Sequence, residues 1–189
     1  CDQAHNEESV FNPTNPYAAS KASAEMLTNS YIESFDMPIT IIRANNIFGV
    51  RQFPEKIIPR TILRLLNNLP ALIYGDGSNM RSYLSVYDLC KAFKLLHDDS
   101  YNGQIFNVGS KSEYSNLEII SRFCELMGKN PEDSINFVTD RPFNDSRYFI
   151  DYKKIRKLGW SQEVFIEDNW QNVIDWYATN LDRYKNIQL

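Results

Sequence analysis

A short apolar run between an alanine-rich segment and a polar loop constrains the fold of this chain most strongly. Residues 38–43 (PITIIR) are largely apolar and β-branched at both odd and even positions, which is typical of a strand buried on both faces of a parallel sheet. The preceding stretch, residues 17–35, is predicted to be a helix with Asn15 or Thr14 as its cap and Pro16 in its first turn. A helix followed by a buried strand predicts an α/β fold.

The rest of the chain continues this alternation. Further helices are expected at residues 55–67, 86–97, 115–127, 152–158 and 166–181, and further strands at residues 71–74, 80–84, 104–108, 134–138 and 147–151. Residues 44–54 are expected to form a polar loop, and residues 75–78 (GDGS) a turn between two strands.

Charge and composition exclude several classes of function. Twenty basic and twenty-four acidic residues give a net charge of −4 without a dense Lys/Arg run, so we expect neither a nucleic-acid nor a membrane partner. Three widely spaced cysteines indicate reduced thiols and a cytoplasmic protein. The only histidines are His5 and His97, which excludes a multi-histidine metal centre, and we expect both on the surface.

The seven glycines are scattered, and none falls into the G-x-G-x-x-G or G-x-x-x-x-G-K pattern that closes backbone N–H groups on a phosphate. The chain therefore contains no recognisable phosphate loop. Its 189 residues are enough for one ordinary domain. However, it opens on Cys1 and a polar stretch without periodicity, which suggests a fragment that starts in a loop.

The first predicted helix carries a tyrosine and a lysine four residues apart, Tyr17 and Lys21. Positions i and i+4 share a helical face, so the ammonium can stabilise a phenolate that acts as a base. The small residues between them would let a planar cofactor approach closely. The alternative is a helix-start tyrosine that packs on the core.

The same spacing recurs at Tyr87 and Lys91. There the next residue is Asp88, whose negative charge would oppose a phenolate. We therefore consider Tyr17 the better candidate for a catalytic base.

Three other polar groups indicate anion and sugar recognition. Asn45 and Asn46 follow a predicted strand, and ligands of α/β sheets lie at the carboxyl ends of strands. Lys56 lies in the first turn of a predicted helix, where N–H groups favour an anion. Arg81 and Arg141 supply guanidinium groups suited to a diphosphate. The alternative for each isolated cation is a solvated surface charge.

Taken together, these segments resemble a known family. The motifs are NPTNPYAASKASAE (12–25), RANNIFGVRQFPEKIIP (43–59), YGDGSNMRSYL (74–84), FNVG (106–109) and DRPFNDSRY (140–148). In this order they resemble the nucleotide-diphosphate-glucose 4,6-dehydratases of the extended short-chain dehydrogenase/reductases, over essentially the whole chain. The resemblance is strongest to the UDP-glucose 4,6-dehydratase module of UDP-rhamnose synthases.

The resemblance implies a cofactor, NAD, and roles for residues at matching positions. Tyr17 would take the proton of the sugar C4 hydroxyl, Lys21 would support it and contact the nicotinamide ribose, and Asn46 would lie near the nicotinamide. Residues implied to bind the nucleotide-sugar substrate are Asn45, Lys56, Ile57, Leu72, Ile73, Tyr74, Arg81, Asn107, Arg141, Asn144 and Tyr148.

The resemblance also implies an arrangement of domains and an oligomer. Residues 1–53 would form the rear part of a doubly wound Rossmann-type parallel sheet. Residues 54–189 would form mainly a small mixed α/β substrate-binding lobe, with residues 82–109 returning to the Rossmann domain. The helix of Tyr17 also carries Met26, Leu27 and Tyr31, and by analogy it would pair with a second copy in a homodimer.

Some departures from the family pattern limit the expected activity. No Thr-Asp-Glu triplet, which supplies the elimination acid and base in the family, precedes Tyr17. Phe48 and Val50 stand where the family usually has Tyr and Pro. We therefore expect the chain alone to be inactive. An NDP-sugar 4-epimerase, a decarboxylase of the same superfamily and a non-catalytic nucleotide-sugar-binding module remain alternatives, and so does a preference for dTDP over UDP.

Overall fold

Helix α1 (Pro16–Phe35) forms as its sequence predicts. The computed structural model describes residues 4–140 and 146–189. The side chain of Asn15 caps α1 by accepting a hydrogen bond from the backbone N–H of Ala18 at 2.8 Å, and Pro16 occupies the first turn. Beyond the left-handed residue Asp36 (φ 49°), the chain turns back into β1 (Ile41–Ala44).

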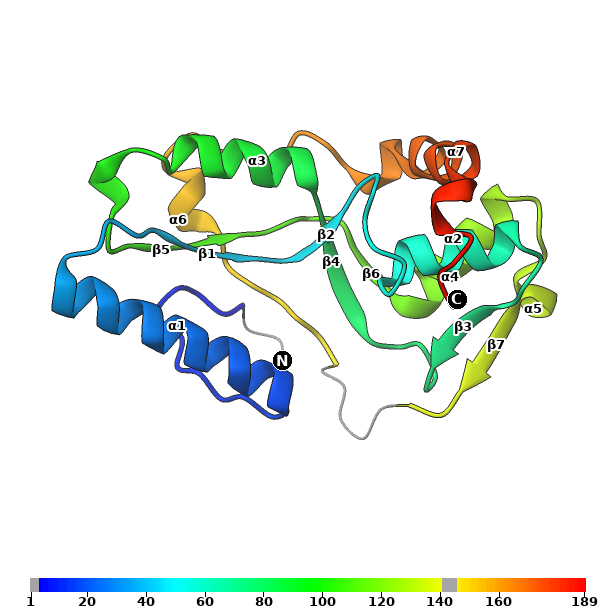
Figure 1. The fold of residues 1–189 in the computed structure, drawn as a ribbon, viewed down its shortest axis with the longest axis horizontal. Coiled ribbons are helices and arrows are strands. Elements are labelled where there is room, and N and C mark those ends of the chain that lie inside the picture. Colours follow the sequence, from blue (N-terminus) through cyan, green and yellow to red (C-terminus); the bar gives the residue numbers. More distant parts are fainter. Residues whose placement is uncertain (1–3, 141–145) are drawn as a thin grey trace.

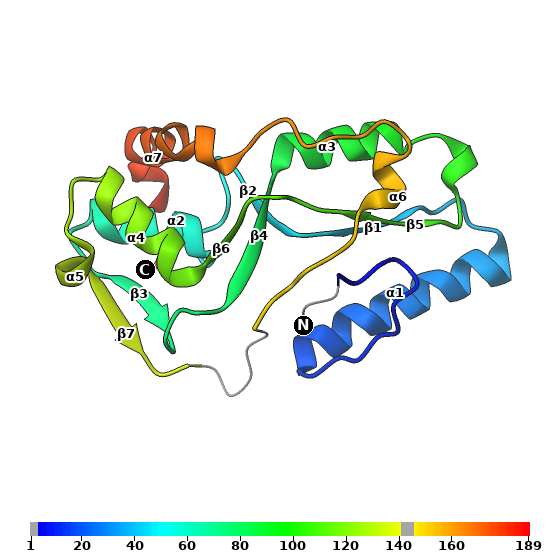
Figure 2. The ribbon, with the colours of Figure 1, turned by 180° about the vertical axis from the view of Figure 1, so that it is seen from behind.

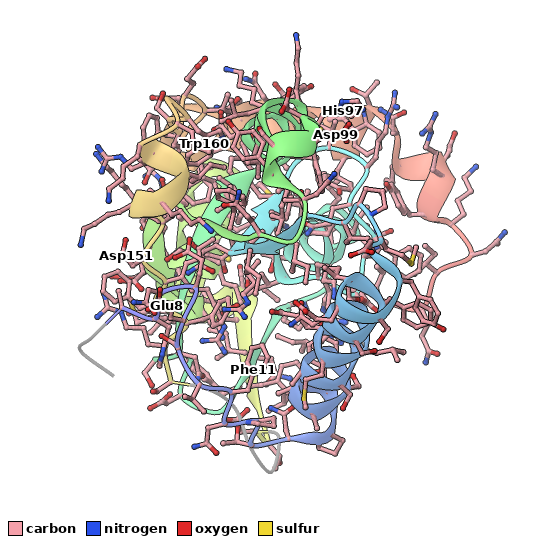
Figure 3. The ribbon with its side chains drawn as sticks, turned by 90° about the vertical axis from the view of Figure 1, so that its left-hand side faces the viewer. Glu8, Phe11, His97, Asp99, Asp151 and Trp160 are labelled. Atoms are coloured by element: carbon pink, nitrogen blue, oxygen red, sulfur yellow. The ribbon has the colours of Figure 1, made fainter. Side chains whose placement is uncertain are left out.

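Strand β1 pairs in parallel with β5 (Ile105–Val108), and helices cover both faces of the pair. Helix α3 (Val86–Leu95) lies on one face together with the short α6 (Lys153–Arg156), and α1 lies on the opposite side (Figures 1 and 3). The core of this part contains Leu84, Ala92, Leu96, Phe106, Val108, Ile155 and Trp160. The predicted α/β fold is therefore confirmed.

The other part of the molecule contains α2 (Ile57–Leu66), α4 (Asn116–Leu126), α5 (Pro131–Ser134) and α7 (Trp170–Thr179), with strands β3 (Ala71–Tyr74) and β7 (Ile135–Val138). Strands β3 and β7 pair in parallel, and the helices gather beside them (Figure 2). Its core includes Ile58, Ile62, Leu63, Leu65, Ile73, Ile119, Phe123, Trp170 and Tyr177.

A three-stranded sheet joins the two parts. Its order is β2 (Asn46–Phe48), β4 (Met80–Ser85) and β6 (Glu113–Ser115), with β2 parallel and β6 antiparallel to β4. The expectation of a continuous loop over residues 44–54 is therefore wrong, and β6 was not predicted at all. Each of these two strands has only three residues, and each forms because β4 lies alongside it.

Three other expectations need correction. Residues 147–151 make isolated bridges, from Arg147 to Met80 and from Ile150 to His5, rather than a strand. The helix expected at 152–158 shortens to α6. The helix expected at 166–181 divides into a 3₁₀ turn, η2 (Ile166–Asp168), α7 and a second 3₁₀ turn, η3 (Leu181–Tyr184).

The burial expected for the first strand is also incomplete, because all four residues of β1 stay partly exposed. In the described ranges, β5 is the one strand that pairs with it.

A third 3₁₀ turn, η1 (Asp99–Tyr101), precedes β5. In the same ranges, no helix combines the length and apolarity needed to cross a bilayer.

Candidate functional site

Tyr17 and Lys21 lie one turn apart on an exposed face of α1. Tyr17 is 74% exposed and Lys21 is exposed, and neither side chain bonds to another described residue. Helix α1 runs antiparallel to β1, so its first turn lies toward the end of the sheet where β1 and β5 stop (Figure 1). A ligand at that end of the sheet could therefore reach the phenol and the ammonium together.

Asn45 is fixed where β1 ends. Its backbone N–H bonds to Val108, its side-chain oxygen accepts from the N–H of Ser110 at 3.1 Å, and its amide nitrogen donates to the carbonyl of Tyr148 at 3.4 Å. The residue is only 4% exposed. These bonds bring Asn45 and Tyr148, both predicted substrate contacts, side by side, whereas Asn46 begins β2 with an exposed side chain.

Asn107 connects three segments of the chain. It is 1% exposed, and its amide nitrogen donates to the carbonyls of His5 and Asp151 at 3.1 and 2.8 Å. Its backbone N–H donates to the carboxylate of Glu7 at 2.9 Å. The segment near the N-terminus and the segment that precedes α6 can be found in Figure 3 at the labels Glu8 and Asp151. The side-chain donors of Asn107 thus serve the fold, and its predicted contact with a nucleotide stays a prediction.

The start of α2 and strand β3 come together at a tyrosine. Lys56 occupies the N-cap position of α2 without a side-chain capping bond, and its exposed ammonium pairs with Glu55 at 2.8 Å. Ile57 is the first residue of the helix. One turn later, Arg60 donates to the hydroxyl of Tyr74 at 3.1 Å.

Along β3 the side chains alternate between the core and the surface. Ile73 is buried in the core, whereas Leu72 and Tyr74 on the opposite face of the strand stay half-exposed. Leu72 and Tyr74 are thus the strand residues placed to meet a ligand near the start of α2.

A turn of two left-handed glycines connects β3 to β4. Gly75 has φ 68° and Gly77 has φ 76°, and the carboxylate of Asp76 accepts hydrogen bonds from both the N–H and the hydroxyl of Ser78. The positive φ of Gly75 favours glycine, and a Cβ at this position would also approach the carboxylate of Asp140 to 2.8 Å.

Of the two arginines predicted to bind a diphosphate, the structure describes only Arg81. Arg81 lies on β4, half-buried, and donates to the carbonyl of Met80 at 2.7 Å. Two residues further along β4, burial raises the pKa of Tyr83 above its ordinary value. The predicted contacts Arg141 and Asn144 lie outside the described residues.

In the second tyrosine–lysine pair, Tyr87 and Lys91, the lysine and the neighbouring Asp88 have structural roles. Lys91 pairs with Glu163. The fully buried carboxylate of Asp88 accepts hydrogen bonds from the backbone N–H groups of Glu163 and Val164. Both charged groups therefore attach the segment around residue 163 to α3.

Sequence reasoning assigned no role to Glu25, Arg43 or Arg60, although Glu25 and Arg43 belong to motifs quoted for the family resemblance. Glu25 follows Lys21 by four residues on the same helix, which was the available signal for it. The described residues contain no group of three His, Cys, Asp or Glu side chains that could hold a metal ion.

Known proteins resemble this chain in sequence over most of its length. The sequence profile of the GDP-mannose 4,6 dehydratase family matches residues 2–173. A trifunctional UDP-glucose 4,6-dehydratase/3,5-epimerase/reductase of Arabidopsis thaliana is 46% identical over 97% of this chain.

Solved structures resemble the fold closely. A dTDP-glucose 4,6-dehydratase from Streptomyces venezuelae, with NAD bound, matches 100% of the chain with a TM-score of 0.95 and 30% identity. A UDP-glucuronic acid 4-epimerase from Bacillus cereus, also with NAD, matches 96% with a TM-score of 0.88 and 28% identity.

The fold and these similarities define the class as the Rossmann-type proteins of the extended short-chain dehydrogenase/reductase group. Within that class, the chain belongs to the GDP-mannose 4,6 dehydratase family. It spans 27% of the Arabidopsis protein and 58% of the Streptomyces one.

Proposed function

We propose that these residues belong to an NAD-dependent dehydratase that converts an NDP-glucose, with UDP-glucose as the first candidate, to an NDP-4-keto-6-deoxyglucose. This would be an early step in rhamnose or deoxysugar synthesis. The carrying observation is the placement of Tyr17 and Lys21 on the exposed face of α1, beside the sheet end that holds Asn45. The 46% identity to a plant UDP-glucose 4,6-dehydratase supports this choice of substrate.

The residues present fit one end of a dinucleotide. The exposed phenol and ammonium and the exposed amide of Asn46 suit the nicotinamide and its ribose, and the small side chains Ala18 and Ala22 leave room beside them. NAD, when bound, would accept a hydride from C4 of the sugar and return it to C6. The sequence holds no glycine-rich phosphate turn, so these residues provide only the Tyr-Lys side of such a site.

Each protein group then has a defined task. Tyr17 takes the proton of the C4 hydroxyl, and the neighbouring charge of Lys21 favours the phenolate. Oxidation at C4 acidifies the C5 proton, which permits loss of water across C5 and C6. The acid and base of that elimination are not assigned to any residue of this chain, so the chain alone is expected to be inactive.

We propose further that the part around β1, β5 and α3 contributes to the NAD-binding unit and that the part around α2, β3 and β7 is the sugar-nucleotide lobe. Lys56, Leu72, Tyr74 and Arg81 lie on that second part or at its border with the first. The free thiols of Cys90 and Cys124 support a cytoplasmic setting.

The activity is tested on the full-length gene product with UDP-glucose and dTDP-glucose, by measuring formation of the 4-keto product. We expect Tyr17→Phe to lower kcat about 10²- to 10⁴-fold, because it removes the proton acceptor. Binding of UDP alone should persist, since the nucleotide residues lie on other elements. Unchanged activity in Tyr17→Phe would favour a non-catalytic nucleotide-sugar-binding module.

An epimerase is the second candidate, because a UDP-glucuronic acid 4-epimerase shares the fold with a TM-score of 0.88. The same assay separates the two. Accumulation of a C4 epimer without any 4-keto-6-deoxy product would assign the protein to the epimerases.

We also propose a homodimer that forms through α1. Met26, Leu27, Tyr31 and Phe35 are 64, 61, 46 and 69% exposed, a row of large apolar side chains that a monomer rarely leaves in water. Sedimentation of the full-length protein tests this. We expect a dimer at micromolar concentration that Leu27→Asp converts to a monomer, and a wild-type monomer would contradict the proposal.

A further inference from the structure

The guanidinium of Arg43 joins three segments of the chain. Its Nε and Nη2 donate to the carboxylate of Glu25 on α1, at 3.1 and 2.5 Å. Its Nη1 donates to the carbonyl of Glu7 at 3.0 Å, and its Cζ lies 4.8 Å from the ring centre of Phe11. The side chains of Arg43 and Glu25 are only 17 and 13% exposed, so the pair is largely shielded from water and from screening ions.

This ion pair is the main polar anchor of α1. Helix α1 contains no fully buried residue, so it gains little from the core. Over the residues that the structure describes, Glu25 to Arg43 is the only ion pair and the only side-chain hydrogen-bonding link between α1 and another element. Figure 1 shows α1 running along one side of the β1–β5 pair.

The anchor links the two elements that carry the groups that the reaction must align. Glu25 follows Lys21 by one helical turn, and Arg43 precedes Asn45 by two residues on β1. We infer that Glu25 and Arg43 are positioning residues, which hold Tyr17 and Lys21 in place relative to Asn45 at the carboxyl end of β1. This inference rests on the proposed function, because the alignment matters only if Tyr17 takes a proton from the bound sugar.

The geometry of the pair suits this task. Two parallel N–H···O bonds fix both the distance and the orientation of the two groups, which the single point charge of a lysine cannot do. A displacement of about 1 Å between reacting groups can cost on the order of 100-fold in rate. Loosening α1 should therefore slow the chemical step more than it weakens substrate binding.

The test uses Glu25→Gln and Arg43→Lys in the full-length gene product, with NDP-glucose as substrate. The matched control is Glu125→Gln, which breaks the exposed pair of Arg122 and Glu125 on α4. We expect kcat to fall about 10- to 100-fold in both variants of the buried pair. The KM should stay within about 2-fold, because most of the proposed nucleotide contacts lie on α2, β3 and β4, away from the pair. The control should match wild type.

A substrate deuterated at C4 separates positioning from general damage. If the pair aligns Tyr17, the isotope effect on kcat should rise in Glu25→Gln, because hydride transfer becomes more fully rate-limiting. A kcat within about 2-fold of wild type would overturn the inference, and so would a lower amount of active enzyme with an unchanged isotope effect. If Glu25→Gln does not fold, Arg43→Lys and Glu25→Asp, which keep both charges, provide the same readouts.

Hydrogen exchange distinguishes this inference from the proposed function. In both variants the amides of residues 16–35 should exchange faster than in wild type, whereas those of α4 should not change. If wild type makes no product from any NDP-glucose, the proposed function fails while the exchange result still reports whether the pair anchors α1. Unchanged exchange in α1 would overturn the anchor itself.

Discussion

Position 109 has to be a glycine because the ring of Tyr152, far along the chain, lies directly against it. A Cβ at this position would come within 2.2 Å of Cδ1 in the ring of Tyr152. That ring in turn packs edge-on against Trp160, with 6.1 Å between the ring centres. Because the ring is held on both sides, it has little room to move away.

Replacing Gly109 by alanine should therefore destabilise the fold by about 1–3 kcal/mol, the usual cost of overpacking. The free energy of unfolding, measured by urea denaturation, checks this value. In a Tyr152→Ala background the same substitution should cost much less, since the ring is gone. An equal cost in both backgrounds would show that the ring contact is not the cause.

Single residues also show what the sequence could not predict about the site. The motifs identified Asn45 and Asn107 as candidates, and the structure places both at the end of the β1–β5 pair or within it. The burial of both side chains, and the use of their amide groups on backbone atoms, depend on segments about 40 to 100 residues away. No pattern near either asparagine indicates those partners.

Helix α3 illustrates how an element is attached by one buried charge. The carboxylate of Asp88 accepts hydrogen bonds from the N–H of Val164 at 2.9 Å and of Glu163 at 3.2 Å. The carbonyl of Asp88 also accepts a bond from the indole of Trp160 at 3.0 Å. This one residue therefore holds the segment from 160 to 164 against the helix.

Asp88→Ala should lower the free energy of unfolding by about 3 kcal/mol, because it leaves two N–H groups without an acceptor. Asp88→Asn, which keeps one oxygen acceptor, should cost less. The exposed pair of Asp182 and Lys185 supplies a control, since Asp182→Ala should change the stability by less than about 0.5 kcal/mol. Urea denaturation measures all three variants, and equal stability of Asp88→Ala and wild type would contradict this account.

Elements with strong local signals were predictable, and short ones were not. The cap at Asn15 and the turn at residues 75–78 depend on neighbouring residues, so α1 and the β3–β4 connection were confirmed. Strands β2 and β6 have three residues each and no local pattern. They exist because β4 supplies the other half of their hydrogen bonds.

At the scale of the whole molecule, buried tyrosines make stability depend on pH. Burial raises the pKa of Tyr83, Tyr114 and Tyr177 above the ordinary value of 10.0. In the unfolded chain these phenols ionise near pH 10, whereas in the fold they keep their protons. Below pH 10 the phenols are protonated in both states, so the fold keeps its full stability. As pH rises above 10, only the unfolded chain can ionise them, and the free energy of unfolding falls.

We expect the free energy of unfolding, measured by urea denaturation, to be steady from about pH 8 to about pH 9.5 and to fall at higher pH. Tyr83 alone should contribute a fall of about 1.4 kcal/mol per pH unit. Tyr83→Phe should reduce this slope. It should also raise stability at neutral pH by about 1 kcal/mol, because the buried hydroxyl of Tyr83 has no partner among the described residues. A slope identical to wild type in Tyr83→Phe would contradict the assignment.

The sequence by itself determined the α/β order of helices and strands, the tyrosine–lysine helix with its cap, and the glycine turn, because each depends on residues adjacent or one helical turn apart. Only the tertiary structure decided which of the two tyrosine–lysine pairs has its lysine in an ion pair, where β2 and β6 pair, and how α1 is anchored. Those outcomes join residues 18 to 102 positions apart, such as Glu25 with Arg43 and Asn107 with His5. Their partners are chosen by packing and burial, which no local pattern records.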